Sequence, residues 1–449
     1  MSVNRQIFSL AWPAIATNIT TPLLSLADVA IVGHADNGKL IGAVALGGTV
    51  FNILYWLFAF LRMGTSGITA QAFGANNIVE QRRIFTRGAL VAALGSCIIF
   101  LLVPLLGKQT VCLIDGGGGV AEEAWTYFSL AIIGAPGVLL TYVNSGWLLG
   151  MQRPRSIMWI ALFTNVLNIL TSLILVYGFH LGIRGVALGT AMSQIAGASV
   201  GFYIVEKLRK SIKAKNQCNP QNANEKLNTS FWDSYAWKSM FRINSDIFLR
   251  TLCLASVTLW FTHAGAKMGN VILAANALLL QLFLVFSYFM DGFAFGGEAL
   301  AGKYFGARNF ITLREVVRKL FLWGFITSVV FTALYFVLGD VFLNLLTDDA
   351  PTLNVVRDFS FWAVLVPLMG FTAFTWDGVF IGLTCTRYLL YSMCISMAVF
   401  FSIYFIGTGI YADVKSANHV LWFAFVIYLG IRGLSSTLMY FRFLRRVNN

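Results

Sequence analysis

Charged residues are scarce in this sequence. They make up 11% of the 449 residues, whereas about 25% is usual for a soluble domain. Hydrophobic residues account for 58%, and apolar runs of about 20 residues or more recur along the chain, each long enough to cross a bilayer as a helix. Short segments of alternating polarity, which would indicate a membrane β-barrel, are missing. The sequence therefore predicts an all-α polytopic membrane protein.

We expect twelve transmembrane helices, and the distribution of basic residues orients them. The expected spans are residues 7–33, 44–71, 85–107, 122–149, 157–179, 185–206, 242–264, 272–301, 319–342, 354–380, 388–411 and 419–441. Basic side chains concentrate in alternate connections and in the tail, among them Arg82, Arg83, Arg153, Arg155, Lys303, Arg308, Arg387, Arg442 and Arg445. This positive-inside bias predicts that both termini are cytoplasmic. Because topology accounts for the net charge of +13, we expect no nucleic-acid partner.

Motifs that would indicate other classes of protein are absent from the sequence. None of the six cysteines forms a CxxC pair, and we expect them to be packing residues. The four histidines lack the spacing of metal ligands. The run 116–119 lacks the Lys-Ser/Thr ending of a phosphate-binding loop, and no nucleophile–base constellation is evident. We therefore expect neither an enzyme nor a bound cofactor. Because no ATP-binding motif is present, any active transport by this chain would draw its energy from an ion gradient.

One part of the sequence recurs after a shift of 232 residues. The shift superposes identical residues, namely Phe73 and Phe305, Gly74 and Gly306, Ala75 and Ala307, Asn77 and Asn309, Gly146 and Gly378, Gly150 and Gly382, and Arg155 and Arg387. These matches lie at the ends of two different spans in each half. A single offset for both indicates an ancient duplication of six helices.

The duplication predicts two six-helix lobes. We place an N-lobe at 1–206, a cytoplasmic linker at 207–240 and a C-lobe at 241–449. Because six is even, both halves enter and leave on the same side of the membrane, as in transporters with parallel repeats. Two lobes around a central cleft can rock between inward-open and outward-open states, although duplication could instead have produced a larger scaffold.

Five acids are expected inside the membrane: Asp28, Asp246, Asp291, Glu298 and Asp377. An ionisable residue there costs about 2.5–3.5 kcal/mol on insertion scales, so it usually faces a cavity and has a function. Asp246 and Arg250 share a helix face, which favours a local ion pair. Asp291 and Glu298 lie two turns apart on one face, where repulsion between carboxylates favours protonation of one of them. The alternative for Glu298 is a position at the cytoplasmic end, in contact with water.

Asp28 has no other charged residue within a turn, and Pro13 and Pro22 lie on the same helix. Burial favours the protonated form of a lone carboxyl group. Prolines favour bends, so the charge state of Asp28 could be coupled to helix shape. A static, hydrogen-bonded Asp28 is the alternative.

The fifth span carries a polar stripe that consists of Asn165, Asn168 and Ser172. Such a stripe faces protein or water rather than lipid, and helix packing is its simpler explanation. The basic residues expected inside the membrane are Arg62, Arg250 and Arg432.

Four stretches of the sequence resemble one known family. They are LADVAIVGH around Asp28, FLRMGTSGITAQAFGA (60–75), MDGFAFGGEALAGKYFGARN (290–309) and WDGVFIGLT (376–384). Together with the 6+6 spans they resemble the MATE multidrug exporters, and more closely the DinF branch. The resemblance implies a V-shaped pair of lobes that exports amphipathic, often cationic compounds in exchange for H⁺ or Na⁺.

The resemblance also implies roles for individual residues. Asp28 matches the favoured proton site of DinF-like members, and Asn168 belongs to the same polar cluster. Ser172 stands where many relatives have an aspartate, which puts the acid pair of the N-lobe in doubt. Asp377 matches an acid implicated in cation binding in other branches, and the resemblance therefore implies a candidate Na⁺ site near Asp377. Asp291 and Glu298 sit in the DinF pattern of the eighth helix.

We therefore predict a monomeric multidrug efflux antiporter of the bacterial inner membrane, in contact with membrane lipid, that exchanges organic cations for H⁺ or Na⁺ by alternating access. The predicted ion-coupling residues are Asp28, Asn168, Asp291, Glu298 and Asp377. The predicted substrate-cavity residues are Arg62, Asn165, Ser172 and Trp376, and the predicted hinge residues are Pro13 and Pro22. The alternative is a flippase for a lipid-linked cell-envelope precursor, which requires a basic cavity for a pyrophosphate group.

Overall fold

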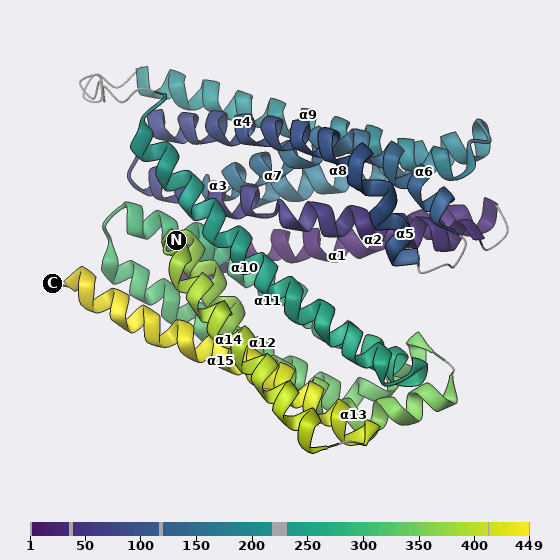
Figure 1. Ribbon diagram of the computed structural model, residues 1–449. Helices are drawn as coiled ribbons and strands as arrows, with labels where there is room; N and C mark the ends of the chain where they lie inside the picture. Colours follow the sequence, from purple (N-terminus) through teal and green to yellow (C-terminus); the bar gives the residue numbers. More distant parts are fainter. Residues whose placement is uncertain are drawn as a thin grey trace. The chain divides into compact units, whose positions relative to one another are not determined.

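The computed structural model describes residues 2–35, 39–115, 120–217, 231–347, 349–411 and 413–448, and these are almost entirely helical (Figure 1). The α-helices are α1 (Val3–Ala35), α2 (Lys39–Leu57), α3 (Phe60–Gly74), α4 (Ile78–Leu102), α5 (Lys108–Asp115), α6 (Ala121–Ala131), α7 (Ala135–Gly150), α8 (Pro154–Leu173), α9 (Gly182–Gln217), α10 (Ser234–Lys267), α11 (Asn270–Gly306), α12 (Phe310–Leu346), α13 (Ala350–Gly382), α14 (Thr386–Ile410) and α15 (Val414–Asn448). Two π-helical turns, η1 (Val103–Gly107) and η3 (Ile174–Gly178), follow α4 and α8, and a 3₁₀ turn, η2 (Ile132–Gly134), precedes α7.

The predicted all-α membrane fold is confirmed. Within the described residues, eleven helical stretches are long and apolar enough to cross a membrane. They coincide with the second to the twelfth predicted spans, and α1 covers the first predicted span with 33 residues. Two spans are interrupted helices: the second is divided into α2 and α3, and the fourth into α6 and α7. Pro136 at the start of α7 explains the second interruption, because proline cannot donate a backbone hydrogen bond inside a helix. The predicted glycine turn at 116–119 lies outside the described residues.

The chain packs as two compact units. The N-unit consists of Trp12–Asn244 and Gly306–Arg308, and the C-unit of Met1–Ala11, Ser245–Phe305 and Asn309–Asn449. The predicted lobes, residues 1–206 and 241–449, divide the sequence at other positions than these units do. Between them, α9 continues to Gln217 and α10 begins at Ser234, while residues 218–230 lie outside the described part.

In the N-unit, α7 packs against α3, α4 and α9, while α8 packs along α9 and α6 lies between α2 and α9 (Figure 1). The core is apolar and contains fully buried aromatic side chains such as Trp147, Phe85 and Phe128. The Trp147 indole donates to the Gln81 carbonyl at 2.8 Å, which satisfies its buried N–H.

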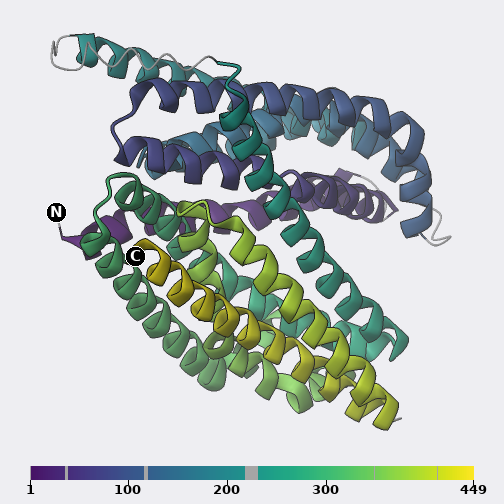
Figure 2. The same cartoon turned by 60° about the vertical axis from the view of Figure 1, so that its left-hand side comes forward.

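In the C-unit, α15 packs against α13 and α14, and α12 packs against α13, so that these helices run side by side in green to yellow in Figure 2. Aromatic rings fill the core between them, among them Trp422, Tyr428, Phe286 and Phe400.

The internal repeat is visible in the backbone. Asn76 and Arg308 both have a φ of 54°, and Gln152 and Thr384 have φ values of 61° and 53°. Each pair is related by the shift of 232 residues, and each residue follows the end of a helix. A left-handed residue at this position is a common way to end a helix. After Asn76 and Arg308, the next helix begins with a side-chain cap, because Asn77 accepts from the Glu80 N–H at 2.9 Å and Asn309 accepts from the Thr312 N–H at 3.0 Å.

The repeated glycines mark equivalent close contacts between helices. A Cβ on Gly146 would overlap the Arg62 carbonyl oxygen, and one on Gly378 would overlap the Ala294 carbonyl oxygen. One turn later, a Cβ on Gly150 or Gly382 would lie 2.8 Å from the Ser66 carbonyl or 2.5 Å from the Glu298 carbonyl. Each unit therefore contains one pair of helices, α3 with α7 and α11 with α13, that packs backbone to backbone at the same repeat positions.

The first helix of each half begins in the unit of the other half. The first turns of α1 belong to the C-unit, where a Cβ added to Gly296 of α11 would lie 3.7 Å from the Ile7 carbonyl oxygen, and the Tyr304 hydroxyl donates to Gln6 at 2.8 Å. The first turns of α10 belong to the N-unit, where Gly64 of α3 meets Asn244. Because Gly64 and Gly296 are repeat equivalents, the exchange is reciprocal.

Candidate transport site

Asp28 lies in the N-unit near the end of α1, and only 6% of it is exposed. The Tyr127 hydroxyl of α6 lies within electrostatic reach of the Asp28 carboxyl group and beside Thr190 of α9. Three residues further along α1, the Ile31 carbonyl accepts from the Tyr177 hydroxyl at 3.1 Å. Three other segments of the N-unit, α6, α9 and η3, therefore surround the end of α1.

Asn168 of α8 joins the same cluster through Thr190. Its side-chain amide donates to the Thr190 hydroxyl at 3.0 Å, and Asn168 and Ser172 are fully buried. Ser172 packs against Gly189 of α9, where a Cβ would lie 2.5 Å from the serine Oγ. The π-helical turn η3 begins two residues after Ser172, and such turns are frequent at functional sites.

Three oxygens of these residues are buried and find no hydrogen-bond partner among the described residues: Asp28 Oδ1, Asn168 Oδ1 and Ser172 Oγ. A buried polar atom without a partner costs about 1–3 kcal/mol, so its retention needs an explanation. A site that takes up and releases a proton or a small polar group requires such available oxygens.

The other predicted residues of the N-unit lie apart from these contacts. The Asn165 side chain donates to the Thr20 carbonyl of α1 at 3.4 Å, a long hydrogen bond that links α8 to α1. Arg62 of α3 is half-buried and lies within electrostatic reach of Tyr142, whose hydroxyl donates to the Tyr55 carbonyl at 3.3 Å.

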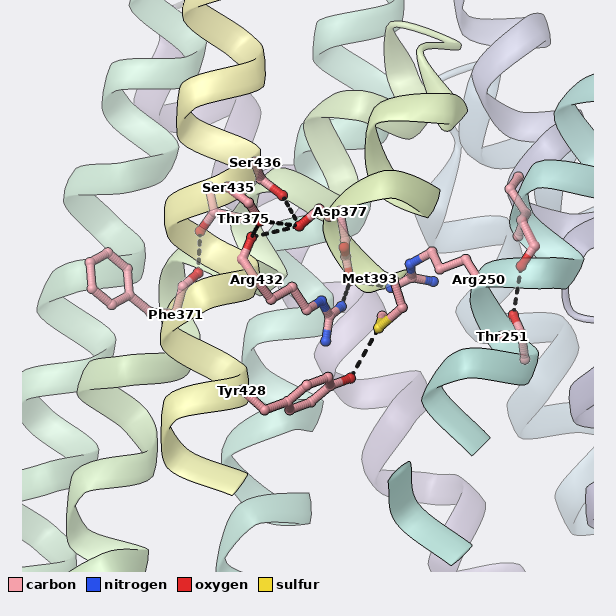
Figure 3. A network of polar contacts seen from close by, with 12 residues as sticks. Arg250, Thr251, Phe371, Thr375, Asp377, Met393, Tyr428, Arg432, Ser435 and Ser436 are labelled. Carbon is pink, nitrogen blue, oxygen red and sulfur yellow. Dashed lines mark hydrogen bonds and ion pairs between the residues drawn. The ribbon is translucent and has the colours of Figure 1, made fainter. Parts of the chain in front are cut away.

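In the C-unit, Asp377 of α13 lies between two arginines. Its Oδ2 accepts from the guanidinium groups of Arg250 of α10 and Arg432 of α15, as Figure 3 shows. All three residues are at least nine-tenths buried, and the Tyr428 hydroxyl beside them donates to Met393 Sδ at 3.1 Å. The carboxylate of Asp377 is therefore already paired with two permanent positive charges.

The expected ion pair between Asp246 and Arg250 is wrong. Arg250 reaches across to Asp377, whereas Asp246 accepts from the Thr386 hydroxyl of α14 at 2.8 Å. Neighbours four residues apart on a helix gain only about 0.2–0.5 kcal/mol from pairing, which a buried tertiary partner outweighs.

The two acids of α11 have different surroundings. Asp291 is half-buried and acts electrostatically on Arg250 and Arg432, so it belongs to the charge cluster around Asp377. Glu298 is fully buried, and its carbonyl meets Gly382 of α13 in the tight helix contact. The alternative that placed Glu298 in water does not fit this burial.

Trp376 was predicted to line the substrate cavity, and Pro13 and Pro22 were predicted to be hinge residues. Trp376 is 3% exposed, donates to the Thr437 hydroxyl at 2.7 Å and packs against Phe321 and Tyr440, which favours a structural role. Pro13 is buried and stands two residues after the last α1 residue of the C-unit. Pro22 is part of the same continuous helix, and its side chain lies outside the described residues.

A Na⁺ site at Asp377 does not fit these residues. Sodium, like other hard cations, requires several oxygen ligands, whereas both donors at Asp377 Oδ2 are cationic nitrogen groups. Within the described residues, no group of three or more His, Cys, Asp or Glu side chains could hold a metal ion. The N-unit cluster offers carboxyl, amide and hydroxyl oxygens instead.

The contributions of Tyr127 and Thr190 could not be predicted from the sequence. Both residues come from helices far along the chain, and neither stands in a local motif. Thr190 does lie opposite the predicted stripe of α8, so the stripe itself indicated that polar partners would face it.

Comparison with known proteins agrees with this architecture. The sequence model of the family described as MatE matches residues 13–174 and 247–410. The chain is 33% identical to the DNA damage-inducible protein F of Escherichia coli (strain K12) over 438 residues, which cover 97% of this chain and 91% of the relative. It is 22% identical to the probable multidrug resistance protein NorM of Thermotoga maritima, over 79% of this chain and 75% of the relative.

A crystal structure of MATE in the bent conformation superposes with a TM-score of 0.84, over 100% of this chain and 97% of that chain, at 16% identity. A transporter from Pyrococcus furiosus, reported to have a binding pocket of reverse polarity, superposes with a TM-score of 0.80 over 100% of this chain and 97% of that chain, at 16% identity. These likenesses show the fold, and the sequence matches show the family. The chain therefore belongs to the MATE family of multidrug and toxic compound efflux transporters, with the DinF protein among its relatives.

Proposed function

We propose that this transporter exports amphipathic organic cations in exchange for protons, with Asp28 as the proton carrier. The observation that carries the proposal is the contrast between two of the buried acids, Asp28 and Asp377. Among the described residues, Asp28 Oδ1 has no hydrogen-bond partner and Asp28 forms no ion pair, whereas Asp377 is bound by two arginines. Of these two acids, Asp28 can exchange its proton without breaking a buried ion pair, whereas Asp377 cannot.

The choice of H⁺ over Na⁺ rests on the number of acids in the N-unit cluster. A single carboxyl group can carry a proton by itself, whereas a cation site usually converges several oxygens, often more than one of them charged. Ser172 supplies a hydroxyl group where a second acid would strengthen a cation site. Na⁺ coupling is the outcome to test against.

The proton and the organic cation compete for the negative charge of Asp28, and this competition couples their transport. Protonated Asp28 is neutral and attracts an organic cation less than the carboxylate does. Linkage then requires the reciprocal effect, namely that binding of the cation promotes release of the proton. The first helix carries Asp28 and Pro13, so the charge state of Asp28 can bias the shape of α1 and hence the alternation of access.

Relatives support the proposed cargo. The protein NorM of Thermotoga maritima is named a probable multidrug resistance protein, and the relative MepA of Staphylococcus aureus is named a multidrug export protein. We extend this class of cargo to the present chain, which we place as a monomer in the bacterial inner membrane with both termini in the cytoplasm, as the positive-inside bias favours.

The test uses purified protein in liposomes with a pH-sensitive dye inside. A proton gradient is imposed, a fluorescent lipophilic cation is added, and the wild type is compared with Asp28→Asn and with the matched variant Asp358→Asn. Asp358 forms an exposed pair with Lys415 and serves as the control for loss of an acid. We expect cation-dependent proton movement in the wild type and the control, and its loss in Asp28→Asn.

Two results would contradict the proposal. If a Na⁺ gradient drives movement of the organic cation while no protons move, the coupling ion is Na⁺ rather than H⁺. Absence of cation movement under either gradient would remove the drug-export function and favour the flippase. The flippase is not favoured, because Arg250 and Arg432, the buried arginines of the C-unit, are both bound to Asp377 rather than available to a pyrophosphate.

A further inference from the structure

Two cysteine side chains from different helices of the C-unit touch each other. Cys253 of α10 and Cys394 of α14 are 141 residues apart, and their Sγ atoms lie 3.9 Å apart. Neither of these two cysteines forms a disulfide. Contact between two thiols so distant in sequence requires a precise helix pairing.

That pairing is supported by contacts on both sides. The Asp246 carboxylate accepts from Thr386 at 2.8 Å, with a separation of 140 residues. The Trp260 and Phe401 rings lie 5.6 Å apart, with a separation of 141 residues. A nearly constant separation shows that α10 and α14 run in parallel and in register from Asp246 to Trp260. The cysteine contact lies midway along this interface.

The dithiol faces the region of the acyl chains. Cys394 is exposed and Cys253 is partly exposed, and large apolar side chains around them are exposed as well, namely Leu249, Leu252, Tyr391 and Ile395. In a membrane-spanning helix such a surface contacts lipid. Water-soluble thiols such as glutathione are excluded from this region, whereas lipid-soluble oxidants enter it.

We propose that Cys253 and Cys394 form a redox-active dithiol that a lipid-soluble hydroperoxide converts into a disulfide between α10 and α14. One thiol takes an oxygen atom from the hydroperoxide, which breaks the O–O bond and yields a sulfenic acid and an alcohol. The second thiol attacks the sulfenic sulfur, the S–S bond forms, and water leaves. The two sulfurs lose two electrons in total, and the peroxide gains them.

The disulfide would act on the charge cluster of the C-unit. An S–S bond is about 2.05 Å long, so the sulfurs must approach from 3.9 Å and the helices must shift slightly. Cys253 lies three residues after Arg250, and Cys394 follows Met393, which contacts Tyr428 beside Arg432. Oxidation therefore fixes the spacing of helices that hold the Asp377 cluster, and we expect it to stop transport reversibly.

The experiment counts thiols. In a variant that keeps only this pair, with Cys97, Cys112, Cys218 and Cys385 replaced by serine, proteoliposomes are treated with cumene hydroperoxide. The protein is unfolded in detergent, and the free thiols are labelled with a polyethylene-glycol maleimide that shifts the gel band. The matched control carries Cys394→Ala together with Ile395→Cys, which keeps an exposed thiol but turns it about 100° around the helix.

We expect the number of labels to fall from two to zero, without dimer bands, and to return to two after dithiothreitol. The control should keep at least one label or form dimers. Retention of both labels, or an irreversible loss of one label at a time, would overturn the proposal. Transport is measured on the same samples, but the label count decides the question even for a chain with another cargo or coupling ion.

Discussion

At the residue scale, the two halves use their buried acids in opposite ways. Asp28 lies near the Tyr127 hydroxyl and keeps one oxygen without a hydrogen-bond partner among the described residues. Asp377, in contrast, is bound by Arg250 and Arg432. Removing one partner of a buried ion pair leaves the other charge uncompensated, which is more costly than never having had the pair. The charge of Asp377 is thus required by the C-unit itself.

Asp377→Asn should destabilise the protein by about 3–5 kcal/mol, because two buried guanidinium groups lose their counter-ion. Thermal unfolding in detergent measures the effect, with Asp358→Asn as the exposed control. Removal of one arginine in the same background, as in Asp377→Asn with Arg432→Gln, should recover part of the loss. An unchanged unfolding temperature in Asp377→Asn would show that the arginines do not depend on this acid.

The residues of the site were predictable where one helix carried the signal. An isolated aspartate in an apolar run and a polar stripe on the fifth span identified Asp28, Asn168 and Ser172 as buried. The partners of these residues were not predictable, because they come from α6 and α9. The same limit produced the error at Asp246, whose neighbour on the helix is bound by Asp377 of α13.

At the element scale, the internal repeat corresponds to shared backbone features as well as to identical residues. The shared pattern at the ends of the second and eighth spans is a left-handed residue followed by an asparagine cap, and the shared glycines are positions where two helix backbones touch. The sequence could not predict that the second and fourth spans are interrupted, or that the first turns of α1 and α10 change units. Those features depend on tertiary contacts made far along the chain.

Gly378→Ala should destabilise the C-unit by about 1–3 kcal/mol, because the added methyl group would overlap the Ala294 carbonyl and push α11 from α13. Gly409→Ala is the matched control, since nothing lies within 4 Å of its Cβ position. Chemical unfolding of the two variants in detergent separates packing from helix propensity, which favours alanine at both sites. Equal stabilities would mean that α11 and α13 can move apart without cost.

The same comparison can be made independently in the N-unit. Gly146→Ala should weaken the contact of α7 with the Arg62 carbonyl, whereas Gly48 of α2 has open space around its Cβ position. An effect at Gly378 without one at Gly146 would show that the repeat has kept its sequence but not its packing.

At the scale of the whole molecule, neither half of the sequence contains all the residues of one packed unit. The N-unit includes the start of α10, and the C-unit includes the start of α1. Asn4 and Gln6 hydrogen-bond to Trp323 and Tyr304, so the contribution of α1 to the C-unit is specific rather than incidental.

Split expression tests this dependence. A polypeptide of residues 1–217 and another of 218–449 should each aggregate or be degraded when expressed alone, and should be recovered together as a folded complex when co-expressed. Size-exclusion chromatography and protease resistance provide the readout, with the uncut chain as the reference. A monodisperse, protease-resistant half on its own would contradict the expectation.

The reciprocal exchange also restricts how such a gene could arise. An ancestor that encoded only six helices would have presented the face around the equivalent of Gly64 and Gly296 without the turns that now cover it. A second, identical protomer could have supplied those turns and received the same in return. Fusion of two such genes would then have placed both copies of the exchanged helix start within one polypeptide.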